Sequence, residues 1–513
     1  MKKRKNLIYK IFSWQTVVIL SLILQLAFIG YFIFSGANSS RFIAIALETI
    51  SFIIIIYILL NKEKGVYKIP WIYLNLFMPI FGSVLFLMLK SQSSTKKLSK
   101  GIIDTENNMK GHSYFMGEAI EECIQRLPNH ANKITYLENS QGFPIYKNSR
   151  AKYYPSGEEM LKGLKQSLIK AKKYIFMEYF IIEDGKMWQE IFSILKLKAS
   201  RGVEVRVIYD DIGCMGKLPQ NFKQTLQKHK IQCAVFNPFR PFLTSILNNR
   251  DHRKITIIDG TVAFTGGINI ADEYINEVER FGHWKDTGVK ITGKGAWGFT
   301  TIFLQMWELI TKKKENFAKY FPKENKEKEI IADGYVQPYA DSPMNNEDVA
   351  EEVYLSVIQN AKRYLYITTP YLILDDTMLK ALSLSAKSGV DVRIITPHIP
   401  DKKFVHMTTK SYYHDLILAG VKIYEYEKGF IHSKMVVSDD EVAVVGTVNL
   451  DYRSLYLHFE CGAIMYSSRE ILEIKKDVLQ TLNESKPITQ KECKANIFKR
   501  ITQSFLRMFA PLM

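Results

Sequence analysis

The chain has 513 residues, more than one ordinary domain needs, and 47% of them are hydrophobic, enough for a large buried core. Lysine and arginine (69) exceed aspartate and glutamate (52), and the net charge of +17 predicts an anionic partner, either nucleic acid or an anionic membrane surface. Five scattered cysteines without a CxxC spacing and ten histidines without an HExxH motif argue against a disulfide framework or a zinc site, so we predict no metal and no cofactor.

Three apolar runs follow a basic N-terminal arm, MKKRKNLIYK. Residues 14–34 are long enough to cross a bilayer, and the immediate second run, 42–60, makes a cleaved signal peptide the weaker alternative. The third run, 69–89, contains Pro79 and Gly82, so it is a kinked span, a re-entrant segment or an interfacial one, and we favour a third span. We therefore predict a membrane region over 1–90 with two or three transmembrane helices, in a multi-pass protein of the cell membrane.

The orientation of this region stays open. Both the N-terminal arm and the stretch after residue 89 are basic, and basic flanks favour the cytoplasmic side. Three full spans cannot place both there, whereas two spans and a re-entrant segment can.

Residues 91–133 are polar and are predicted to be a linker with some helix. Short β-branched runs then alternate with helical stretches, as in α/β units. The segment from Ala171 (AKKYIFMEYF…RGVEVRVIYDD) is repeated from Ala361 (AKRYLYITTPY…SGVDVRIITPH). We predict an α/β fold in which two similar repeats, 134–321 and 328–513, form one pseudo-symmetric unit.

Each repeat then carries the same polar motif. The first block is HRKITIIDGTVAFTGGIN, from His252 to Asn269, and the second is HSKMVVSDDEVAVVGTVN, from His432 to Asn449. In both, Lys follows His by two residues, Asp follows five later, and Gly-x-x-Asn closes the block. Residues i and i+2 of a strand share a face, so His and Lys project together. A single HxK is commonplace, but two full matches at equivalent places of a repeat indicate function.

These residue types suit the cleavage of a phosphodiester. The reaction needs a nucleophile, an acid for the leaving oxygen and donors around the phosphate oxygens. One imidazole can attack phosphorus while the other moves the protons, because the histidine pKa lies near neutrality. Lysine and asparagine side chains supply the donors without a metal.

The two blocks resemble the paired HKD motifs of the phospholipase D superfamily. The resemblance implies one active site at the seam of the two halves, with His252 the likelier nucleophile and His432 the general acid and base. The resemblance also implies which residues would hold the phosphate, namely Lys254, Lys434, Asn269, Asn449 and Thr447, with the two lysines counted as catalytic. The motif acids, Asp259 and Asp439, count as catalytic members. On physical grounds we expect these two acids to orient structure or pair with a cation.

Superfamily members often carry a downstream acid that orients the histidine. Glu460, in LHFECG, takes that place in the second half and Asp286 in the first. An ordinary surface ion pair is the alternative for both. Many members have Ser after the motif Gly, where this chain has Gly267 and Thr447, and the Gly-Gly pair is usual in the cardiolipin synthase branch.

Longer segments resemble that branch, among them FGHWKDTGVKITG and VGTVNLDYRSLYLHFE. The resemblance implies that two phosphatidylglycerol molecules, anionic phospholipids at the membrane, condense to cardiolipin and glycerol through a phosphohistidine. A nucleic-acid phosphodiesterase is disfavoured by the membrane runs, so we expect no nucleic acid as partner. A hydrolytic phospholipase D and a phosphatidylserine synthase share the motifs and stay open, as does the oligomeric state. The C-terminal IFKRITQSFLRMFAPLM is either an interfacial amphipathic helix or a core-packed one.

Overall fold

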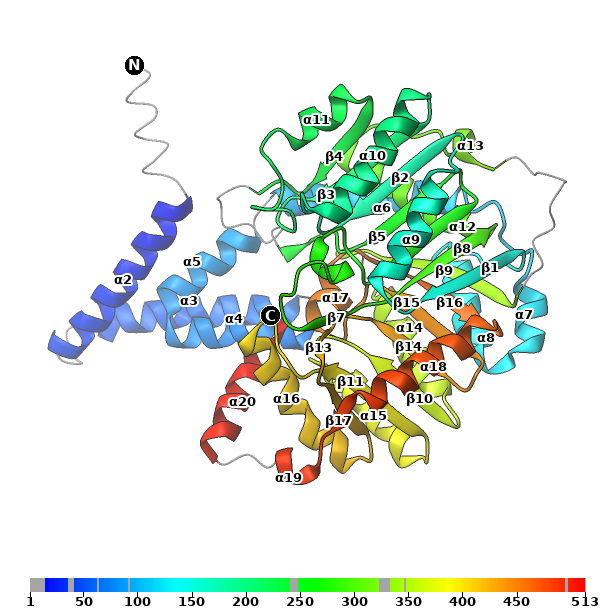
Figure 1. Ribbon diagram of the computed structural model, residues 1–513. Helices are drawn as coiled ribbons and strands as arrows, with labels where there is room; N and C mark the ends of the chain where they lie inside the picture. The colour runs from blue at the N-terminus through cyan, green and yellow to red at the C-terminus, as the bar shows by residue number, and fades with distance from the viewer. Residues whose placement is uncertain are drawn as a thin grey trace, which may run out of the picture. The chain divides into compact units, whose positions relative to one another are not determined.

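The computed structural model describes residues 14–35, 41–61, 64–90, 93–239, 248–322, 333–345, 347–493 and 497–512 (Figure 1). The basic N-terminal arm and the predicted start of the second repeat at residue 328 lie outside them. The described chain divides into two compact units. One contains the N-terminal helices, and the other contains residues 99–238 and 249–503.

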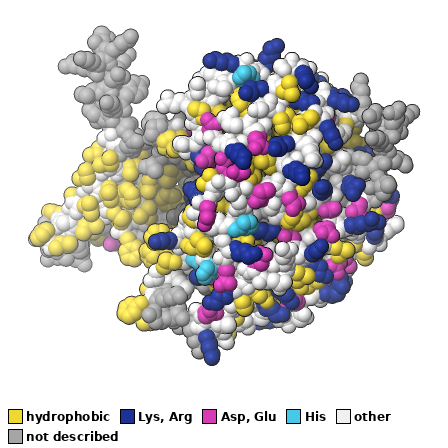
Figure 2. Space-filling view, viewed as in Figure 1, with side chains coloured by type: hydrophobic (Ala, Val, Ile, Leu, Met, Phe, Trp, Pro, Cys, Tyr) yellow, Lys and Arg dark blue, Asp and Glu magenta, His cyan; other side chains and the backbone are white. Residues whose placement is uncertain are grey.

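The N-terminal unit contains four apolar helices, α2 (Trp14–Ser35), α3 (Arg41–Leu60), α4 (Gly65–Phe77) and α5 (Pro79–Lys90). Their surface is covered with hydrophobic side chains, in contrast to the mixed charges over the rest of the molecule (Figure 2). Within the described ranges, one helix segment, Phe42–Leu60, is long and apolar enough to cross a membrane, whereas Thr16–Tyr31 and Pro79–Leu89 are shorter apolar helices.

The third apolar run does not form one helix. α4 ends before Met78, and α5 begins at Pro79, whose ring cannot continue the preceding helix. The two helices pack so closely that a Cβ on Gly82 would lie 2.8 Å from the carbonyl oxygen of Leu74. The Gln25 side chain accepts a hydrogen bond from the free backbone N–H of Ile80 at the start of α5 (2.9 Å). The run is therefore a helical hairpin.

The larger unit is built on two sheets with the same strand order, as the repeat predicted. The first is β1-β8-β6-β5-β2-β3-β4, and the second is β9-β16-β15-β14-β10-β11-β12 with β17 added at its edge. In each, three parallel strands join an antiparallel set. The strands of the first sheet are β1 (Ser149–Tyr154), β2 (Tyr174–Tyr179), β3 (Glu204–Asp210), β4 (Ile231–Phe236), β5 (Lys254–Ile258), β6 (Val262–Gly266) and β8 (Gly288–Gly293).

The strands of the second sheet are β9 (Tyr335–Asp341), β10 (Tyr364–Thr368), β11 (Asp391–Pro397), β12 (Lys422–Tyr426), β14 (Met435–Ser438), β15 (Val442–Gly446), β16 (Glu460–Tyr466) and β17 (Ser485–Pro487). The two sheets face each other across a seam, where β6 contacts β15 and β16 and β1 contacts β9. A short parallel pair, β7 (His283–Lys285) with β13 (Gly429–Ile431), also joins the halves.

Helices cover both sheets (Figure 1). They are α9 (Gly157–Leu168), α10 (Lys186–Ser200), α11 (Phe222–Lys228) and α12 (Gly295–Thr311) in the first half, and α14 (Val349–Asn360), α15 (Asp376–Lys387), α16 (Lys403–Leu418) and α18 (Glu470–Asn483) in the second. α12 is buried along nearly its whole length and contacts strands of both sheets, β5 and β9. His252 lies just before β5 and His432 just before β14, at the strand ends near the seam.

Along the chain, the N-terminal helices are followed by α6 (Ser93–Lys110), α7 (Ile120–Arg126) and α8 (Ala131–Thr135), so the predicted linker is largely helical where it is described. The C-terminal segment forms α20 (Ile497–Phe509). Four large apolar side chains of α20 are exposed, namely Ile497, Phe498, Ile501 and Phe505, so this helix is not packed into a core.

Candidate active site

The two motif histidines are tied across the seam by their backbones. The N–H of His252 donates to the carbonyl of Phe459 (2.9 Å), and the N–H of His432 donates to the carbonyl of Lys285 (2.7 Å). Phe459 and Lys285 each directly precede one of the predicted acids, Glu460 and Asp286. Each crossing strand therefore delivers its next side chain to the imidazole of the other half.

The acids accordingly orient histidines in the opposite halves from those in which they lie. Nδ1 of His252 is 2.9 Å from Oε1 of Glu460, and Nδ1 of His432 is 2.6 Å from Oδ2 of Asp286. Both acids are buried, so neither is a surface ion pair. The sequence placed Glu460 with the second half and Asp286 with the first, because chain order does not show which backbone crosses the seam.

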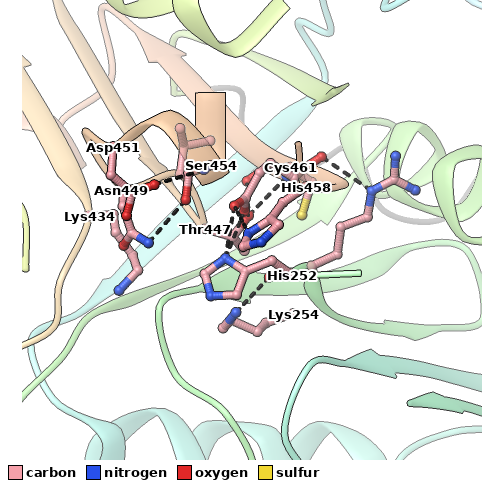
Figure 3. A network of polar contacts seen from close by, with 12 residues as sticks. His252, Lys254, Lys434, Thr447, Asn449, Asp451, Ser454, His458 and Cys461 are labelled. Atoms are coloured by element: carbon pink, nitrogen blue, oxygen red, sulfur yellow. Dashed lines mark hydrogen bonds and ion pairs between the residues drawn. The ribbon is translucent and has the colours of Figure 1, made fainter. Parts of the chain in front are cut away.

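Small or short side chains make room for these carboxylates. A Cβ on Gly267 would lie 2.1 Å from Oδ1 of Asp286, so only glycine fits there. The equivalent residue, Thr447, donates its hydroxyl to the Glu460 carboxylate and accepts a hydrogen bond from the N–H of Cys461 (3.0 Å). Thr447 therefore helps to fix Glu460. The sequence predicted that Thr447 binds phosphate, but in the structure its hydroxyl donates to the Glu460 carboxylate instead (Figure 3).

Burial disfavours the charged form of both imidazoles. Burial lowers the pKa of His252 to about 3 and that of His432 to about 4, against the opposing attraction of the paired carboxylates. Burial alone would raise the pKa of Glu460, but the charge and hydrogen bond of His252 bring it below the ordinary value. Because each carboxylate holds an Nδ1–H, each Nε2 carries a lone pair that can act as nucleophile or base.

The two lysines supply the positive charge. Nζ of Lys254 donates to the carbonyl of His252 (2.5 Å), and Nζ of Lys434 donates to the carbonyl of His432. An ammonium has three donors, so each lysine keeps donors for an anionic ligand. Burial lowers the pKa of Lys254 to about 8 and that of Lys434 to about 7, and the charge of Lys254 contributes to the lower value.

The motif asparagines are held by their own loops. Asn269 donates to the hydroxyl of Tyr274 (2.7 Å), and its carbonyl oxygen accepts from the N–H of Ile181 (3.0 Å). Asn449 donates to Ser454 (3.0 Å), and its Oδ1 has no partner among the described residues (Figure 3). Each amide has two N–H donors and uses one of them, so each side chain retains a donor for a phosphate ligand.

The motif aspartates serve the fold at the other end of the strands. Asp259 follows β5 with a φ of 54°, and its carboxylate accepts hydrogen bonds from the backbone N–H groups of residues 172, 173 and 174. Asp439 does the same for residues 362, 363 and 364. A five-residue strand is about 16 Å long, so these acids do not reach the histidines. In the structure both carboxylates hold backbone N–H groups at the start of a neighbouring strand.

Sequence reasoning missed the aromatic walls and one further histidine. Phe180 stands edge-on to His252, and Tyr274 and Trp284 each lie 5.4 Å from the ring centroid of His432. His458 lies 5.4 Å from the His252 ring by the same measure. The sequence could have indicated His458 by its position two residues before Glu460, because alternate residues of an extended chain point to the same side.

Comparisons with known proteins match both repeats to one protein family. The family described as "Cardiolipin synthase, PLD-like domain" matches residues 164–296 and 354–483, one match in each repeat. A cardiolipin synthase of a Geobacillus strain is 34% identical over 88% of this chain and 90% of its own length. An uncharacterized protein of Streptococcus mutans is 43% identical over 90% of this chain and 99% of its own length.

One solved structure has a similar fold. The phosphatidylserine synthase of Haemophilus influenzae superposes with a TM-score of 0.54 at 16% identity, covering 71% of this chain and 93% of its own. From the family match in both repeats and the extent of similarity to curated relatives, the chain belongs to the cardiolipin synthase family of phospholipase D-like proteins.

Proposed function

We propose that the chain is a phosphatidyltransferase that joins two phosphatidylglycerol molecules into cardiolipin and glycerol. The observation that carries the proposal is the paired arrangement at the seam. Two buried imidazoles are each held at Nδ1 by a buried carboxylate of the opposite half, beside two buried lysines. The cardiolipin synthase relatives supply the substrate class, an anionic phospholipid.

In the first step, Nε2 of His252 attacks the phosphorus of one phosphatidylglycerol. The bond from phosphorus to the glycerol head group breaks, and the proton on Nε2 of His432 goes to the leaving oxygen. The anionic phosphodiester favours the protonated form of His432 before this step, because a nearby negative charge raises an imidazole pKa. The products are free glycerol and a phosphatidyl group on His252.

In the second step, the now neutral His432 takes the proton from a hydroxyl of a second phosphatidylglycerol. The resulting oxygen attacks phosphorus and the bond to His252 breaks, which releases cardiolipin and restores both histidines. Lys254 and Lys434 stabilise the negative charge on the phosphate oxygens in both steps. The aromatic side chains around the histidines limit the access of water, which would otherwise give phosphatidic acid.

The proposal includes attachment to the cell membrane as a multi-pass protein. Residues 1–90 would be the membrane region, with the helical hairpin of α4 and α5 as a re-entrant segment, and 91–133 the linker. The catalytic repeats would span 134–321 and 328–513. This arrangement leaves two spans, which places the basic stretches on both sides of the region in the cytoplasm. The hydrophobic surface of the N-terminal helices supports it.

The test is product analysis with the full chain in lipid nanodiscs. Phosphatidylglycerol labelled in its acyl chains and head group is supplied without nucleotide or added metal, and lipid and water-soluble products are separated. Cardiolipin and free glycerol in equal amounts, absent with His432→Ala, are expected. Phosphatidic acid as the main product would make the protein a hydrolase, and the absence of any phospholipid turnover would overturn the proposal.

A further inference from the structure

His458 is an unexplained polar group beside the catalytic centre. Its side chain is only 10% exposed, yet neither ring nitrogen has a hydrogen-bond partner among the residues that the structure describes. A buried polar atom without a partner is energetically unfavourable, because it has lost its hydrogen bonds to water. Figure 3 shows this ring beside His252, with the Thr447 side chain nearby. The site therefore has unused binding capacity.

His458, His252 and Glu460 converge on one point. Nδ1 of His458 is 3.7 Å from Oε1 of Glu460, and Nδ1 of His252 is 2.9 Å from the same oxygen. One ligand atom from each of the three residues lies within 4.8 Å of the other two. In a tetrahedral zinc site with bonds of 2.0–2.2 Å, two ligand atoms lie about 3.3 Å apart. This value falls between the distances from the Glu460 oxygen to His252 (2.9 Å) and to His458 (3.7 Å).

The donor set also suits zinc. Two imidazoles and one carboxylate are a common protein ligand set for this ion, with the fourth position left to water or another ligand. The cluster combines one carboxylate, from Glu460, with two imidazoles, from His252 and His458. Within the described ranges it is the one such grouping of three, and the His432–Asp286 pair of the other half is not part of any.

We propose that His252, His458 and Glu460 form an inhibitory binding site for a zinc-type transition-metal cation, occupied in place of the hydrogen bond between His252 and Glu460. A metal bound at Nδ1 of His252 leaves the ring proton on Nε2, since a neutral imidazole carries one proton. The lone pair that would attack phosphorus is then absent. The ligands come from both halves of the chain, which is why no sequence spacing indicated the site.

The inhibitory consequence rests on the proposed function of His252, whereas metal binding does not, so the two are measured separately. The full chain in nanodiscs is freed of metal with a chelator, and zinc ion alone is titrated by calorimetry. The matched variants are His458→Asn and, at an exposed histidine outside the site, His414→Asn. We expect one equivalent bound by the native chain and His414→Asn, and binding at least about tenfold weaker in His458→Asn.

Cobalt ion gives a second reading that requires no variant to fold. A four-coordinate site gives intense visible absorption, whereas cobalt bound loosely at the surface keeps the weak colour of the hydrated ion. Intense absorption that zinc displaces supports the site. Equal zinc affinity in the native chain and His458→Asn, weak cobalt absorption, or no binding at all would each overturn it. If the chain makes cardiolipin, zinc should suppress that activity in the native chain at concentrations that His458→Asn tolerates.

Discussion

At the residue scale, the character of each imidazole is set by a carboxylate that arrives from the other half of the chain. Glu460 and Asp286 each accept a hydrogen bond at Nδ1, which fixes the tautomer and leaves Nε2 for chemistry. Glu460 is itself fixed by the Thr447 hydroxyl, and Asp286 fits only because residue 267 lacks a side chain. The orientation of the histidines is therefore a property of the assembled seam.

Replacing Glu460 by glutamine tests this orientation. The amide keeps the volume of the side chain but removes the charge that stabilises the imidazolium and the preferred tautomer. We expect kcat for cardiolipin formation to fall by about 10²- to 10⁴-fold with a smaller change in KM, by analogy with the acid of a serine-protease triad. Glu427→Gln, at an exposed position, is the control. Unchanged kcat in Glu460→Gln would show that the carboxylate is not part of the catalytic unit.

The buried lysines predict a pH dependence of substrate binding. Burial lowers the pKa of Lys434 to about 7 and that of Lys254 to about 8, so both lose their positive charge as the pH rises through this range. Binding of an anionic phospholipid should weaken accordingly, and KM should rise between about pH 7 and 9. Arginine stays charged, so in Lys434→Arg the rise should begin nearer pH 8. A KM that is constant from pH 6 to 9 in the native enzyme would contradict the assigned role.

At the element scale, the motif aspartates hold strands together at the end remote from the histidines. Asp259 adopts a positive φ, and its carboxylate accepts hydrogen bonds from three consecutive backbone N–H groups at the start of β2. The Asp439 carboxylate accepts three equivalent hydrogen bonds at the start of β10. A five-residue strand then runs from Asp259 to the active site. β5 therefore separates the two ends of the motif, with Asp259 at one end and the proposed catalytic histidine, His252, at the other.

Asp259→Ala should therefore act on stability. Three backbone donors lose their acceptor, and the expected loss is about 1–3 kcal/mol in the free energy of unfolding. The measurement is the thermal transition of the variant beside Asp104→Ala, a control at an exposed position of α6. The specific activity of the folded fraction should stay close to that of the native chain. A folded and stable Asp259→Ala without activity would return this residue to the catalytic set.

At the scale of the whole molecule, the repeat made much of the architecture predictable. Two matching strand–helix–strand segments implied two similar sheets, and the sheets have the same strand order. The motif also located the histidines and lysines that the seam brings together. The exchange of acids between the halves was not predictable, because it depends on hydrogen bonds such as that from His252 to Phe459, which joins residues 207 positions apart.

The N-terminal helices show the same limit. Apolar content identified the helical runs, but the hairpin at Met78 depends on tertiary packing of Gly82 against Leu74 and on the distant side chain of Gln25. His458 was overlooked because its neighbours in space, rather than in sequence, give it significance. Local patterns thus specify which residues are available, and the packing of the halves decides how they are combined.

A pulse–chase experiment on the enzyme itself tests whether His252 carries the phosphatidyl group. The full chain in nanodiscs receives a brief pulse of phosphatidylglycerol labelled in the phosphatidyl group, and covalently bound label is mapped by peptide analysis. We expect a phosphatidyl group on His252 that moves into cardiolipin when unlabelled phosphatidylglycerol is added, and no labelled cardiolipin from His432→Ala. Cardiolipin formed without any label on a histidine, or label that passes only to phosphatidic acid, would contradict this expectation.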